Sequence, residues 1–211
     1  MINVEEQINA VHRQVGSRTI EAGDARTVVI SQTYRATVDD VWDACTNAER
    51  LPRWFLPVSG ELRLGGKYQL EGNAGGTIEA CDPPNRFAAT WEFGGEVSWI
   101  EVRIESVGDE QTRLQLEHIA VVDDARWLEY GPGAAGVGWD LGLIGLSLHL
   151  SGAPAVDPKE FEAWSVSSEG KQFVTAASER WGAANAAAGA DSEAANAAAA
   201  RTTAFYTGAG A

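Results

Sequence analysis

Residues 60–122, GELRLGGKYQLEGNAGGTIEACDPPNRFAATWEFGGEVSWIEVRIESVGDEQTRLQLEHIAVV, decide the fold class. Turn signals rich in glycine, proline and asparagine recur in this stretch, at 65–66, 73–76, 82–85, 94–95 and 108–109. Between the turns apolar and polar residues alternate, as in Ile100 and Val102 against Glu101 and Arg103. Because short loops join antiparallel neighbours, the stretch predicts a six-stranded antiparallel meander with one polar face and one apolar face.

The apolar face of such a sheet needs a cover, and residues 134–150, AAGVGWDLGLIGLSLHL, predict the helix that supplies it. At helical spacing both flanks of this segment are apolar, so we expect the helix to be mostly buried. It is interrupted by Asp140 and His149 and is shorter than the ~20 apolar residues that cross a bilayer. We therefore expect an α+β fold and no membrane span.

The residues before the meander predict helices and one strand. Valine and isoleucine at helical spacing favour a helix over residues 3–15, and alternation from Thr27 favours a strand. Thr37 has the position of a helix cap for a short helix that starts at Val38, and Asn47 can cap a further turn.

The C-terminal part has a different composition. Asp157 followed by Pro158 is a strong helix start, and Asp191 can cap an alanine-rich helix. These patterns predict an N-terminal helix and linker, a main domain and a helical C-terminal extension, over residues 1–25, 26–152 and 153–211. The extension's aromatic residues would pack either on the main body or on a second subunit, so a homodimer or a protein partner bound through these helices is a hypothesis.

The overall charge excludes one class of partner. The chain has 30 acidic and 16 basic residues, for a net charge of −14. Phosphate backbones would be repelled, so we expect no nucleic-acid partner. The N-terminus carries Glu5 and Glu6 and has no unbroken apolar stretch, which does not fit a signal peptide, and we expect a cytoplasmic protein.

Metal and nucleotide motifs are weak. Cys45 and Cys81 are far apart, and the histidines have no spacing that would pair two of them on one helical face, so we expect no metal site and no disulfide framework. Residues 131–136, GPGAAG, match the letters of a dinucleotide-binding motif, but no buried parallel strand precedes them. A loop that leads into the long helix is the preferred interpretation, and we expect no cofactor.

His118 and Tyr68 are the polar residues of interest. Strand parity places His118 on the inward face with Leu114 and Leu116, and it places Tyr68 and Trp91 on the same face. A buried imidazole needs a hydrogen-bond partner, from the chain, a water or a ligand. His118 and Tyr68 are therefore candidate ligand-orienting or acid/base residues, and a satisfied core histidine is the structural alternative.

Several segments carry a family resemblance over about residues 27–150. The chain resembles the helix-grip fold of the START and SRPBCC superfamily, and within it the Aha-type branch named for activators of a heat-shock-protein ATPase. The resemblance rests on Val41-Trp42, Arg53-Trp54-Phe55, the Gly65-Gly66 hairpin before Tyr68, Trp91 after Pro83-Pro84, and Gly138-Trp139. It implies a curved antiparallel sheet wrapped around a long C-terminal helix, with N-terminal and C-terminal helical extensions.

Members of this superfamily include ligand carriers, polyketide cyclases and co-chaperones, so three functions remain open. The first is binding of a small, mostly apolar molecule in an interior cavity. The second is a cyclase- or hydratase-like enzyme that uses the same cavity, with His118 and Tyr68 as its catalytic candidates. The third is an Aha-type interaction protein. The predicted lining residues are Trp54, Phe55, Tyr68, Trp91, His118, Trp139, Leu143 and Leu146.

Overall fold

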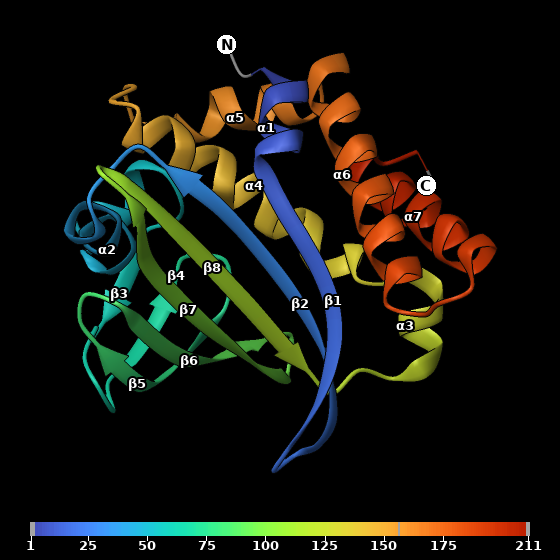
Figure 1. Ribbon diagram of the computed structural model, residues 1–211, viewed down its shortest axis with the longest axis horizontal. Helices are drawn as coiled ribbons and strands as arrows, with labels where there is room; N and C mark the ends of the chain where they lie inside the picture. The colour runs from blue at the N-terminus through green and yellow to red at the C-terminus, as the bar shows by residue number, and fades with distance from the viewer. Residues whose placement is uncertain (1–2, 156, 210–211) are drawn as a thin grey trace. The chain divides into compact units, whose positions relative to one another are not determined.

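The computed structural model describes residues 3–155 and 157–209. Figure 1 shows the helices and strands in chain order. Their bounds are α1 Val4–Ala10, β1 Val11–Ile20, β2 Gly23–Tyr34, α2 Val38–Thr46, η1 Leu51–Arg53 (a 3-10 helix), β3 Val58–Gly60, β4 Lys67–Leu70, β5 Gly75–Asp82, β6 Arg86–Phe93, β7 Glu96–Gly108, β8 Gln111–Ala120, α3 Asp124–Tyr130, α4 Gly133–Leu150, α5 Pro158–Ser165, α6 Ser168–Ala187 and α7 Ser192–Thr207.

The described residues form two compact units. The helical unit consists of residues 3–30, 121–144 and 157–209, and the sheet unit consists of residues 31–120 and 145–155. The strands form an eight-stranded sheet in the order β1-β2-β8-β7-β6-β5-β4-β3. The predicted α+β class with an antiparallel sheet is thus confirmed.

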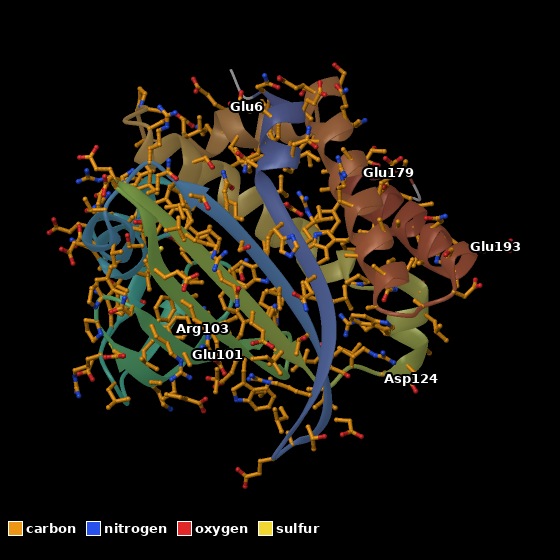
Figure 2. The ribbon with its side chains drawn as sticks, viewed as in Figure 1. Glu6, Glu101, Arg103, Asp124, Glu179 and Glu193 are labelled. Atoms are coloured by element: carbon orange, nitrogen blue, oxygen red, sulfur yellow. The ribbon has the colours of Figure 1, made fainter. Side chains whose placement is uncertain are left out.

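The meander of the sheet unit consists of β3 to β8, and each strand pairs antiparallel with the next. The strands β4 to β8 lie where the turn signals predict strands, but no strand precedes the Gly65-Gly66 turn within residues 61–64, because β3 already ends at Gly60. Ile100, Val102 and Ile104 of β7 are buried, whereas Glu101 and Arg103 lie on the opposite face. Figure 2 shows these two side chains on β7, where their charged groups pair at 3.2 Å. The alternation in the sequence therefore separates core from solvent across this strand.

Phe93 is an exception to the predicted alternation. Parity along β6 places it with Trp91 on the inward face, but 58% of its surface is exposed. Phe93 is the last residue of β6 and pairs with Glu96 next to the Gly94-Gly95 turn. A side chain at a strand end beyond the core has no core residues packed over it, so strand parity alone does not bury Phe93.

The N-terminal prediction is wrong in part. The expected helix over residues 3–15 ends at Ala10, and Val11 begins the ten-residue strand β1. Val11 and Val15 are buried in β1. A four-residue spacing places two side chains on one face of a strand as well as of a helix, which is why the pattern could not separate the two.

The helix caps follow the sequence closely. The side chains of Thr37, Asp157 and Asp191 accept hydrogen bonds from backbone N–H groups at the starts of α2, α5 and α7. The long helix α4 covers Gly133–Leu150, as predicted. Among residues 3–155 and 157–209, none of the helices combines the length and the apolar character that a bilayer crossing requires.

The glycine-rich motif at 131–136 is not preceded by a strand. The helix α3 ends at Tyr130, and Gly131 terminates it with a positive φ before α4 begins at Gly133. The expected loop is thus reduced to a two-residue connection between two helices. The strand-turn-helix context of a dinucleotide site is missing from this described segment.

A buried ion pair organises the helical unit. Arg13 of β1 contacts Asp140 of α4 through Nη2 at 2.6 Å and Nε at 3.2 Å, and the indole Nε1 of Trp181 in α6 donates to Asp140 at 2.8 Å. The ring of Trp181 lies against Gly136, where a Cβ atom would come within 2.3 Å of it. Trp181, a fully buried tryptophan of the C-terminal extension, therefore packs on α4 of its own chain.

Candidate functional site

The inner face of the sheet unit brings three predicted residues together. Tyr68 lies on β4, Trp91 on β6 and His118 on β8, and Ser98 on β7 lies between the last two. Trp91 pairs directly with Ser98, and Ile100, two residues further along β7, pairs with His118. Paired residues point to the same face of a sheet, so Trp91, Ser98 and His118 share the buried side of the strands.

His118 is held by its neighbours on this face. Its Nε2 lies 2.8 Å from the hydroxyl of Ser98, which in turn donates to the backbone carbonyl of Trp91 at 3.1 Å. The imidazole and indole rings of His118 and Trp91 are 6.3 Å apart. Burial disfavours the charged form and lowers the pKa of His118 to about 4, so the ring is neutral at pH 7.

Tyr68 is also held by the sheet. Its hydroxyl donates to the backbone carbonyl of Thr90 at 2.7 Å. Burial, with a smaller contribution from the nearby carboxylate of Glu92, raises the pKa of Tyr68 to about 12. The phenol is therefore protonated at neutral pH, and its hydrogen is directed at the chain itself.

Trp54 and Phe55 follow the short helix η1 and form an aromatic pair with ring centroids 5.4 Å apart. The indole of Trp54 donates to the carbonyl of Ala44 at 2.9 Å, which ties the pair to α2. Both residues are half-buried, and Leu146 of α4 is fully buried.

The glycine edge of α4 allows a close backbone approach. Gly138, Gly142 and Gly145 lie on one edge of this helix by helical spacing. A Cβ atom on Gly145 would lie 2.0 Å from the carbonyl oxygen of Trp54, so at this position the backbones touch. The missing side chain serves helix packing here.

The remaining predicted lining residues are Trp139 and Leu143. They lie on the part of α4 that belongs to the helical unit, where Leu143 is buried and Trp139 is half-buried. With Leu146 they fall on one flank of α4 by helical spacing. Their contribution to a ligand site stays a prediction.

Sequence reasoning missed a second polar group in the sheet unit. The amide of Gln32 on β2 donates to the hydroxyl of Ser147 on α4 at 2.9 Å, and the hydroxyl of Tyr34 lies 3.4 Å from the Gln32 carbonyl oxygen.

Burial raises the pKa of Cys45 to about 12 and that of Tyr34 well above its ordinary value. The Cys45 thiol is therefore not a reactive nucleophile at neutral pH.

A charged cluster lies where α2, η1 and the end of α4 meet in the sheet unit. The guanidinium of Arg50 contacts the carboxylates of Asp40 and Asp43 at 2.8 and 2.9 Å, and its Nε and Nη2 lie 3.1 and 2.9 Å from Nε2 of His149. Partial burial and the neighbouring arginines Arg50 and Arg53 lower the pKa of His149. A neutral His149 accepts from Arg50, so this cluster links the three elements.

Metal-binding residue types do not gather in the described part of the chain. Among residues 3–155 and 157–209, no group of three or more histidine, cysteine, aspartate or glutamate side chains could hold a metal ion.

Comparisons with known proteins place these observations in a family. The model of a family described as Activator of Hsp90 ATPase homolog 1-like protein matches residues 35–147. No curated protein matches the chain.

Several solved structures are similar. CalU16 from Micromonospora echinospora, known from a crystal structure, is 35% identical in sequence to this chain. The two structures match with a TM-score of 0.64, over 86% of this chain and 99% of the CalU16 chain. The solution structure of CalU16 is 36% identical, with a TM-score of 0.69 over 85% and 97% of the two chains. PFC0360w, an HSP90 activator from Plasmodium falciparum, is 23% identical, with a TM-score of 0.51 over 61% and 97%, which shows the fold alone.

Proposed function

This chain belongs to the Activator of Hsp90 ATPase homolog 1-like protein family, and we propose that its sheet unit binds a small, mostly apolar molecule against the inner face of the sheet. At the level of the family and its structural neighbours, the comparisons support a ligand-binding domain. The observation that carries the finer proposal is the neutral His118–Ser98 pair beside Trp91, on a face that is otherwise mostly aliphatic.

Core packing alone does not call for such a pair. Taking a polar side chain out of water costs roughly 1–3 kcal/mol unless hydrogen bonds replace its hydration, whereas aliphatic side chains would fill the same face without that cost. Polar groups among aromatic and aliphatic walls are typical of small-molecule sites, where they orient the ligand. Departures from simple core chemistry also concentrate at functional positions.

The half-buried aromatic residues supply the apolar contacts in this proposal. Trp54, Phe55 and Trp91 are all half-buried in the sheet unit. Removing a ligand's apolar surface from water would favour binding by ~25 cal/mol per Å². We therefore expect affinity to come from apolar burial and orientation to come from His118 and Tyr68.

Two measurements test the proposal. Native mass spectrometry of the freshly purified full chain should detect a retained small molecule, and fluorescence titration should detect binding of 2-naphthol as a defined aromatic probe. His118→Leu should keep the fold and weaken retention of either molecule. His12→Leu, at an exposed position on β1, is the matched control and should bind as the wild type does. A wild-type chain that neither retains a molecule nor binds the probe would overturn the proposal.

An enzyme that uses the same residues is a weaker candidate. General acid–base catalysis is most efficient when the pKa of the catalytic group lies near the working pH. The pKa of His118 is about 4, so its ring takes up a proton poorly at pH 7. The environment of His118 therefore favours recognition over proton transfer.

A co-chaperone function is favoured by one specific observation, the family match over residues 35–147. It is tested by the rate of ATP hydrolysis of purified Hsp90 with and without the full chain. Stimulation that persists in His118→Leu would support this second candidate, because it would not depend on the inner face of the sheet. An unchanged hydrolysis rate would contradict it.

A further inference from the structure

The contact between Arg50 and His149 has a fixed hydrogen-bond direction. A guanidinium only donates, and the Nε and Nη2 atoms of Arg50 lie 3.1 and 2.9 Å from the same ring nitrogen, Nε2 of His149. Nε2 must therefore carry a lone pair, so this contact requires a neutral imidazole. Both residues belong to the sheet unit, with His149 in the last turn of α4 and Arg50 directly before η1.

The segment that follows Arg50, residues 51–55, is attached to the end of α4 at two places. One is the contact of Arg50 with His149. The other is Gly145, where a Cβ atom would lie 2.0 Å from the carbonyl oxygen of Trp54. Only the first of these two attachments contains a group that can change its charge between neutral and mildly acidic pH.

The same segment is also attached to α2. The indole of Trp54 donates to the carbonyl of Ala44 at 2.9 Å, and Nη1 of Arg50 contacts the carboxylates of Asp40 and Asp43 at 2.8 and 2.9 Å. These contacts involve no atom of the histidine. A break between the histidine and the guanidinium would therefore leave the segment on α2 and weaken its attachment to α4.

The charged groups around His149 come from α2 and from the segment itself. Partial burial has the largest effect and, together with Arg50 and Arg53, it lowers the pKa of His149 from its ordinary value of 6.5, while the carboxylate of Asp40 raises it by less. Asp43 completes the group through its ion pair with Arg50. The ring is therefore neutral at pH 7 and takes up a proton below pH 6.5.

We propose that the Arg50–His149 contact is a pH-sensitive switch that controls the position of the aromatic pair Trp54–Phe55. Protonation places a hydrogen on Nε2, which breaks both hydrogen bonds from Arg50 and brings two positive charges together. Residues 51–55 then separate from the end of α4, and a bound molecule loses the apolar contacts of this pair. The inference rests on the proposed function, which assigns those contacts to the ligand.

The switch can be followed without any ligand. In an NMR titration of the full chain from about pH 7.5 to about pH 5, the Nε–H signal of Arg50 and the backbone amide signals of residues 51–55 should change with the same midpoint as the His149 ring. His149→Gln, which cannot be protonated, should abolish this shared change. His12→Gln is the matched control at an exposed position on β1 and should keep it. Signals of Arg50 and the segment that do not follow the His149 ring would overturn the switch.

Binding of 2-naphthol, which is uncharged over this pH range, tests the consequence for the ligand. We expect its dissociation constant for the wild type and for His12→Gln to rise about fivefold between about pH 7.5 and about pH 5, because one net hydrogen bond is worth about that factor. His149→Gln should show no such rise. His149→Lys, which is positively charged at both pH values, should bind weakly at both.

The other titrating groups are common to the wild type and the His149 variants. His118, with a pKa of about 4, stays mainly neutral over this range. An equal rise in the wild type and in His149→Gln, or no rise in the wild type, would overturn the switch and leave binding on the inner face intact. A wild-type chain that does not bind 2-naphthol at neutral pH would instead overturn the proposed function.

Discussion

Low pH should destabilise the protein by protonating His118, and the contribution of this one residue can be measured separately. The pKa of His118 is about 4 in the folded chain, against an ordinary value of 6.5. The unfolded chain therefore binds a proton on this residue at a higher pH than the folded chain does, and lowering the pH favours unfolding. The stability that depends on a neutral His118 is fully present above pH 6.5 and is lost progressively as the pH falls toward 4. Since one pKa unit corresponds to about 1.4 kcal/mol, the full loss is about 3 kcal/mol.

The assay is urea unfolding of the wild type and of His118→Leu at neutral pH and at about pH 4, followed by circular dichroism. Carboxylates and His149 titrate in both proteins, so their contributions cancel when the free energies of unfolding are subtracted. We expect the wild type to lose about 3 kcal/mol more than the variant between the two conditions. If the two pH profiles run parallel, the neutral, desolvated state of His118 is refuted.

Two substitutions test the packing of each unit. Arg13→Met leaves the Asp140 carboxylate buried without its cation and should lower the free energy of unfolding by about 3–5 kcal/mol. The control Arg113→Met removes a half-exposed pair with Glu105 and should lower it by under about 1 kcal/mol. Equal losses for the two variants in urea unfolding would contradict this account. Gly76→Ala should lower the melting temperature clearly, because the added Cβ would lie 2.2 Å from the carbonyl oxygen of Thr90. A variant that melts at the same temperature as the wild type would show that β5 and β6 move apart without an energetic cost.

Much of the fold could be predicted because its signals are local. Turn residues and a period of two define the strands β4 to β8, and a segment apolar on both flanks defines α4. The start of β1 could not be found in this way, since Val11 and Val15 satisfy the spacing of a helix and of a strand equally. Only pairing with a neighbouring strand decides between them, and pairing is not local in sequence.

The candidate site shows the same division. Strand parity was enough to place Tyr68, Trp91 and His118 on one face. The partner of His118 depends on the register between β6, β7 and β8, which brings Ser98 opposite Trp91, and no short-range pattern encodes that register. The Gln32–Ser147 contact joins residues 115 positions apart and was missed for the same reason.

The two kinds of polar group in the interior of this protein differ in charge. In the helical unit the Asp140 carboxylate receives hydrogen bonds on both oxygens, from Arg13 and from Trp181, and its side chain has no exposed surface. A charge matched in this way is expected of a structural anchor. On the inner face of the sheet unit, His118 is neutral and its Nε2 lies 2.8 Å from the hydroxyl of Ser98. The ion pair is thus explained by stability, whereas the neutral polar groups of the inner face fit the small-molecule recognition of the proposed function.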